Sequence, residues 1–142
     1  MPPTFELILR FAVAYALALP VAWDREHEDR SAGLRTFPLV AISAAGYVTI
    51  ALIAFAGSPD AQSRVLQGLL AGMGFIGGGA ILHVGRGVHG TATAAALWAT
   101  ACIGVACAYS AYPVAIFLSI LSFVTLRFMK KWKPEDRRER ER

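Results

Sequence analysis

Charged residues are scarce in this chain of 142 residues. Only 17% are Asp, Glu, Lys or Arg and 56% are apolar, against about 25% and 45–50% in an average soluble domain. A mean hydropathy of +0.49 excludes an intrinsically disordered chain, because disordered segments lack apolar residues. A chain of this length forms about one domain. We therefore expect one membrane domain and no separate soluble catalytic domain.

Cysteine and recognisable catalytic patterns are equally sparse. Cys102 and Cys107 are the two cysteines; in a helix they would lie about 7.5 Å apart along the axis, beyond the reach of a disulfide. No spacing of nucleophile, base and orienting group is present, and neither a Walker A glycine loop nor a dinucleotide fingerprint occurs. We therefore predict that the protein is not an enzyme and has no cofactor.

Apolar runs of the length that crosses a bilayer dominate the sequence. About 20 residues span the hydrocarbon core as a helix, and five runs of that size occur at 5–23, 37–57, 65–84, 91–109 and 112–129. They predict an all-α membrane protein, a compact bundle of five transmembrane helices over residues 1–129. Residues 130–142 form a tail of mixed basic and acidic charge, expected as a helical extension or a disordered segment.

The distribution of Lys and Arg predicts the orientation. Three arginines lie in 24–36, one lies in 85–90 and eight basic residues follow position 126, whereas the opposite connections contain only Arg64. Cytoplasmic loops carry the excess of Lys and Arg, so we predict an external N-terminus and a cytoplasmic tail. The tail also carries four acids, which favours a membrane surface over nucleic acid as its partner.

Small residues recur at helical spacing and predict close helix packing. Ala14, Ala18 and Ala22 follow one another every four residues, and the third and fourth runs are rich in glycine and alanine. Such residues let membrane helices approach closely, so we expect a tight bundle and a homo-oligomer, with a dimer favoured. Alternatively, the Gly77–Gly79 run unwinds the third helix and exposes carbonyl oxygens to an ion.

The connection at 24–36 holds four carboxylates within six residues. One interpretation is a solvated helical extension, with Arg25 facing Asp29 and Glu26 facing Arg30 at i, i+4. The other is a cation or partner site, because hard divalent ions prefer carboxylate oxygens. The weak candidates for metal ligands are Asp24, Glu26 and Glu28.

Three further charged or titratable groups attract attention. We predict that Asp24, Arg25 and Arg35 form a charge-assisted network, because they flank the first two runs at the same interface. Arg10 is a charge inside the first run, either a functional group or an i, i+4 partner of Glu6. The histidines at 83 and 89 are interpreted as interfacial polar residues rather than a metal pair.

Three ordered motifs resemble the transmembrane domain of the MgtC/SapB family of bacterial inner-membrane proteins. The first is "DRE" at 24–26 followed by "AGLRT" at 32–36, and the second is "GMGFIGGGAI" at 72–81. The third is "VHG" at 88–90 with "TAAALW" at 93–98 and "IG" at 103–104. Two departures are Asp24, where the family usually has Glu, and Ala92, where it usually has a polar residue. Longer members carry a soluble C-terminal domain where this sequence has a short charged tail, so it resembles a member with the transmembrane domain alone.

The resemblance implies a multi-pass protein of the bacterial inner membrane. It also implies a link to growth in low Mg²⁺ and, in some pathogens, to survival inside host cells. Members are thought to act through contacts with other membrane proteins, including the proton-translocating ATP synthase or an ion-transport ATPase. Together with Arg10, the motif residues expected to carry this function are Asp24, Arg25, Glu26, Gly33, Arg35, Thr36, Gly74, Gly77, Gly78, Gly79, Gly90, Thr93 and Trp98.

Two functional hypotheses follow. The first is a non-enzymatic regulator that modulates ion homeostasis or membrane energetics by helix-to-helix contact, which the small-residue faces favour. The second is an ion or small-solute transporter that uses Arg10, the Gly77–Gly79 run and the carboxylates from Asp24 to Asp29.

Overall fold

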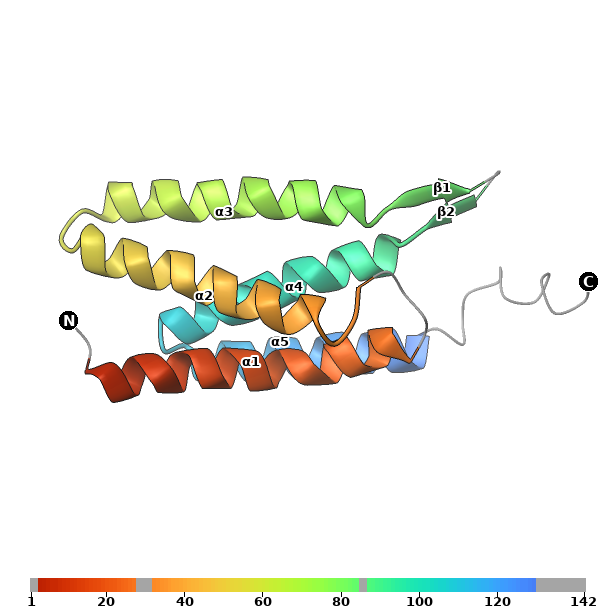
Figure 1. The fold of residues 1–142 in the computed structure, drawn as a ribbon, viewed down its shortest axis with the longest axis horizontal. Helices are drawn as coiled ribbons and strands as arrows, with labels where there is room; N and C mark the ends of the chain where they lie inside the picture. The colour runs from red at the N-terminus through yellow and green to blue at the C-terminus, as the bar shows by residue number, and fades with distance from the viewer. Residues whose placement is uncertain (1–2, 28–31, 85–86, 130–142) are drawn as a thin grey trace, which may run out of the picture.

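The computed structural model describes residues 3–27, 32–84 and 87–129 (Figure 1). Within these ranges the chain forms five helices and one antiparallel hairpin, which confirms the helical bundle. The helices are α1 (Thr4–Glu26), α2 (Thr36–Ala54), α3 (Pro59–Gly79), α4 (Thr91–Ala108) and α5 (Tyr112–Phe128), and the strands are β1 (Leu82–Val84) and β2 (Gly87–His89). The charged tail at 130–142 lies outside the described residues.

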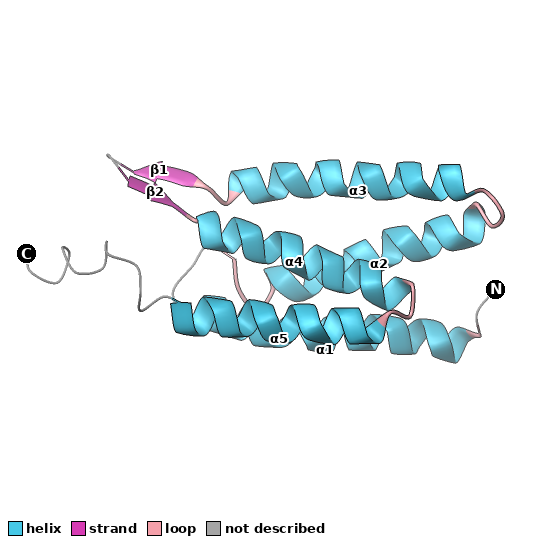
Figure 2. Ribbon diagram, turned by 180° about the vertical axis from the view of Figure 1, so that it is seen from behind, coloured by secondary structure: helices cyan, strands magenta, loops and turns pink. Residues whose placement is uncertain are grey.

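The helices lie lengthwise beside one another. In both views α3 lies along one edge of the bundle, α1 and α5 lie along the opposite edge, and α2 and α4 lie between them (Figures 1 and 2). The hairpin, the end of α1 and the end of α5 lie at one end of the molecule, here called the hairpin end. The α2–α3 and α4–α5 connections lie at the other, the turn end. Helices α1, α2 and α4 are long and apolar enough to cross a membrane, and α5 is a shorter apolar helix.

Alanines form the centre of the bundle, as the spacing predicts. Ala14 and Ala18 of α1 and Ala41 and Ala45 of α2 are all completely buried. Gly104 of α4 lies so close to the backbone carbonyl of Ala41 that a Cβ at this position would overlap it. The bundle therefore depends on small residues where α1, α2 and α4 meet, because membrane helices associate by close packing rather than by a hydrophobic driving force.

The third helix differs from its predicted bounds. The apolar run predicts a span at 65–84, but α3 begins at Pro59 and ends at Gly79. Proline suits the first turn of a helix because its missing N–H has no partner there, and Asp60 in that turn complements the helix dipole. The end of the predicted span instead belongs to the hairpin, in which Leu82 pairs with His89.

The glycines of α3 contradict the unwound interpretation and agree with the packing interpretation at Gly77 alone. The helix continues through Gly79, so the unwound alternative is wrong. Only Met73 and Gly77 of α3 are buried, and a Cβ added at Gly77 would lie 3.4 Å from the Trp98 ring. At Gly74, Gly78 and Gly79 an added Cβ would meet no atom within 4 Å. These three glycines therefore do not pack inside the bundle.

Candidate functional site

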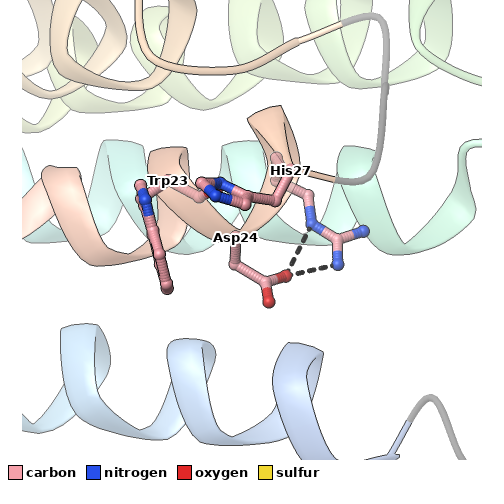
Figure 3. Close-up of polar contacts among 4 residues, drawn as sticks. Trp23, Asp24 and His27 are labelled. Carbon is pink, nitrogen blue, oxygen red and sulfur yellow. Dashed lines mark hydrogen bonds and ion pairs between the residues drawn. The ribbon is translucent and has the colours of Figure 1, made fainter.

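The last turn of α1 inserts two charged side chains into the protein. Asp24 is completely buried and Arg25 is 3% exposed, and the preceding residues Val21 and Ala22 are buried with them. The Arg25 guanidinium donates to Asp24 Oδ2 from Nη2 at 2.6 Å and from Nε at 3.2 Å. Figure 3 shows the Asp24 carboxylate pointing from α1 toward α5. The sequence-predicted pairing of these two residues is confirmed.

This ion pair is incompletely satisfied. Asp24 Oδ1 is buried and has no hydrogen-bond partner within the described part of the chain. Burying charges is costly, and removing one member of a buried pair costs more than removing both. This oxygen can accept a hydrogen bond from a water molecule or another donor. Ionisable groups buried in membrane bundles are functional candidates for this reason.

Glu26 closes the connection between α1 and α2. Its Oε2 accepts a hydrogen bond from the Leu34 backbone N–H at 2.9 Å. The same carboxylate lies against Gly33, where any added Cβ would overlap it. The Gly33 carbonyl in turn accepts from the N–H groups of Thr36 and Phe37 at the start of α2. A side chain at position 33 would therefore displace the Glu26 carboxylate from its contact with the Leu34 N–H.

Arg35 does not join the network that the sequence predicts. It is the N-cap residue of α2, its side chain is exposed, and it lines a groove between α2 and α3 instead. The prediction is thus right for Asp24 and Arg25 and wrong for Arg35. The end of α1 is joined to the start of α2, but through Glu26.

The structure describes only some of the residues on which the metal and helical-extension interpretations depend. The i, i+4 partners Asp29 and Arg30, the candidate ligand Glu28 and the side chain of His83 lie outside the described residues. Within the described ranges no group of three or more His, Cys, Asp or Glu side chains could hold a metal ion. Asp24 is buried, whereas Glu26 is exposed and bound to the backbone.

Arg10 joins two helices at the turn end. Its Nη2 pairs with Glu6, which confirms the i, i+4 interpretation. Its Nη1 also donates to the carbonyl of Ala108, the last residue of α4, at 2.6 Å. A cation at the carboxyl end of a helix is favoured by the helix dipole. The Ala108 partner lies 98 residues away and no local pattern points to it.

The third motif joins α3 to α4. Gly90 has φ of +87°, which favours glycine, and a Cβ there would overlap the Ala80 carbonyl. Thr93 is buried, and the half-exposed Trp98 lies against Gly77. These motif residues therefore shape the helix junction.

The three motifs and most of the bundle lie within the region that matches a known family. The model of the MgtC family matches residues 11–134, most of the chain. This chain belongs to the MgtC family. Asp24, Arg25, Gly33 and Gly90 of this MgtC-family chain all fall inside the matched region.

Curated relatives agree with this assignment. The chain is 37% identical over 117 residues to Protein MgtC of Salmonella typhimurium, covering 82% of this chain and 49% of the relative. It is 36% identical over 119 residues to an uncharacterized protein of Synechocystis, covering 84% and 50%. It is 40% identical over 97 residues to Protein MgtC of Brucella abortus, covering 68% and 40%. The chain thus spans about half the length, or less, of these relatives, and no solved structure matches it.

Proposed function

We propose that this MgtC-family chain is a non-enzymatic, multi-pass protein of the bacterial inner membrane that serves Mg²⁺-related homeostasis by contacting other membrane proteins. Family membership and three helices apolar enough to span a membrane support the membrane assignment. Transport remains the competing hypothesis. The arrangement of charges and small residues along the bundle favours contact over transport.

The observation that carries this proposal is the close packing of the bundle between its turn end and its hairpin end, each of which has a charged contact. Arg10 is bound at the turn end, whereas the Asp24–Arg25 pair lies at the hairpin end. Between them the bundle is closed by buried alanines and by the contact of Gly104 with the Ala41 carbonyl. An ion path needs polar groups or water along its length. Among the buried hydroxyls, those of Thr100 and Ser119 already donate to backbone carbonyls, and that of Thr49 has no partner within the described residues.

The exposed side of α3 is the proposed contact surface. Gly74 and Gly78 are four residues apart and therefore lie on one face of the helix. Both positions are open to a second helix, because an added Cβ would meet no atom within 4 Å. Small residues on an exposed membrane helix allow close backbone approach by a partner. The proposed partners are a second copy of this chain and an ATP synthase or ion-transport ATPase.

Complementation tests the contact surface. In a bacterium lacking its own family member, the wild-type chain should restore growth in low Mg²⁺, whereas the double variant Gly74→Leu, Gly78→Leu should not. Ala12→Leu is the matched control, because Ala12 is an exposed small residue of α1. Membrane abundance of each variant is measured in parallel. Full rescue by the double variant would show that this face is not used.

Reconstitution tests the competing transport function. Purified protein in liposomes loaded with Mg²⁺-sensitive or pH-sensitive dyes should give no saturable flux above empty liposomes. A saturable flux that Asp24→Asn or Arg10→Gln abolishes would overturn the regulator proposal and support transport.

A further inference from the structure

A groove of about 880 Å³ lies between α2 and α3. Its α2 wall extends from Arg35 to Tyr47 and its α3 wall extends from Val65 to Ile76. Most of the lining side chains are apolar, and Arg35 is the one charged residue among them. Gly68 and Gly72 widen the groove, because an added Cβ at either position would meet no atom within 4 Å.

The length of the groove restricts what it can hold. The twelve residues from Arg35 to Tyr47 rise by about 18 Å along a helix. One leaflet of bilayer hydrocarbon is about 15 Å thick, half of a core of about 30 Å. A partner transmembrane helix crosses both leaflets and would extend beyond the groove. The observed groove instead matches the length of a single lipid acyl chain.

Charge selects the headgroup. Arg35 is exposed at the start of α2, at the hairpin end of the groove, and Thr36 beside it provides a hydroxyl group. A guanidinium binds phosphate oxygens in a forked arrangement. Basic residues at the mouth of a cleft between membrane helices are a recognised mode of binding anionic lipid headgroups.

We propose that this groove binds an anionic glycerophospholipid, with the phosphate at Arg35 and one acyl chain between α2 and α3. The lipid fills space that protein side chains leave open and so supports α3, of which only Met73 and Gly77 are buried. Lipid occupancy thereby stabilises the position of α3, the helix with the proposed contact surface.

The headgroup contact is tested by native mass spectrometry of the purified protein in detergent. Phosphatidylglycerol should be retained in preference to phosphatidylcholine with the same acyl chains. Arg35→Gln should weaken phosphatidylglycerol binding about fivefold, the share of one arginine near an anionic surface. Arg127→Gln is the matched control, because Arg127 is an exposed arginine in the last turn of α5. It should leave binding unchanged.

The acyl-chain contact needs its own variant. Gly72→Leu places a side chain in the groove, where an added Cβ meets no atom within 4 Å, and should reduce lipid retention several-fold. Ala12→Leu on α1 should not reduce it. Thermal unfolding of each variant without added lipid verifies the fold.

Four results would overturn the proposal. Equal retention of both lipids, or equal losses in Arg35→Gln and Arg127→Gln, would indicate only diffuse surface attraction. Unchanged retention in Gly72→Leu would place the acyl chain elsewhere. Chemical cross-linking of the wild-type protein and of Gly72→Leu tests for a second copy in the groove. If Gly72→Leu loses a cross-linked dimer but keeps its lipid binding, the occupant is a second copy of the chain. None of these results depends on the low-Mg²⁺ growth phenotype, so the two proposals fail separately.

Discussion

Asp24 and Arg25 are neighbours in the sequence, and both side chains are buried at the end of α1. We predict that Asp24→Asn lowers the free energy of unfolding by about 3 kcal/mol, because a buried ion pair loses one partner. Unfolding of the purified protein in mixed detergent micelles, followed by circular dichroism, measures this loss.

Double-mutant cycles identify which residues are coupled to Asp24. Arg25 forms a direct ion pair with Asp24, so the effects of Asp24→Asn and of a substitution at Arg25 should be strongly non-additive. Arg35 is exposed, so Asp24→Asn and Arg35→Gln should be additive within about 0.3 kcal/mol. A larger coupling between Asp24 and Arg35 would restore the network that the structure contradicts.

Arg10 has two partners on different helices. We predict that Arg10→Gln lowers the free energy of unfolding by about 1.5–3 kcal/mol, the range for hydrogen bonds to charged groups. Glu6→Gln should cost less, because it leaves the Arg10 contact with the Ala108 carbonyl in place. Equal losses in both variants, measured by the same detergent titration, would mean that the contact with α4 contributes nothing.

At the scale of the helices, two glycines have opposite surroundings and form a matched pair. Gly104→Ala should destabilise the bundle by about 1–3 kcal/mol, because the new Cβ overlaps the Ala41 carbonyl. Gly74→Ala should be neutral or stabilising by up to about 1 kcal/mol, because the position is open and alanine favours a helix. Thermal unfolding in detergent compares them. Similar melting temperatures for the two variants would contradict the described packing of α4 against α2.

The helix boundaries show where local sequence is informative. The predicted runs at 91–109 and 112–129 begin where α4 and α5 begin. A glycine interrupts the apolar pattern before α4, and a short polar turn interrupts it before α5. The third run begins later than α3. Hydropathy excludes the charged residues Asp60 and Arg64 from a membrane span, although both are compatible with a helix. Apolar content also places 82–84 in the span, whereas pairing with Gly87–His89 makes them a strand.

The orientation of the whole molecule is a separate prediction. The ends of α1 and α5, which carry Arg25 and Arg127, lie at the hairpin end, whereas the α2–α3 connection before Asp60 lies at the turn end. The excess of basic residues marks the cytoplasmic side. A reporter fused after Lys133 should therefore be cytoplasmic, and one inserted near Asp60 should be external. The reverse pattern, scored with paired phosphatase and fluorescent reporters, would contradict this orientation.

Much of this protein follows from its sequence alone. Apolar runs long enough for a bilayer predict the five helices found within residues 3–27, 32–84 and 87–129, and alanines at a spacing of four predict the buried face of α1. The pairing of Arg10 with Glu6 is also local, because residues four apart share a helix face.

Only the tertiary structure decides which apolar and glycine-rich faces meet protein. Gly104 lies against α2 whereas Gly74 and Gly78 are open, although all three occur in similar small-residue patterns. Hydropathy cannot separate these cases, because lipid tails are as apolar as the side chains of a neighbouring helix. The contacts of Arg10 with the Ala108 carbonyl and of Ser119 with the Leu17 carbonyl join residues about a hundred positions apart. Such contacts exist only once the helices have packed, because packing alone brings the end of one helix to the side of another.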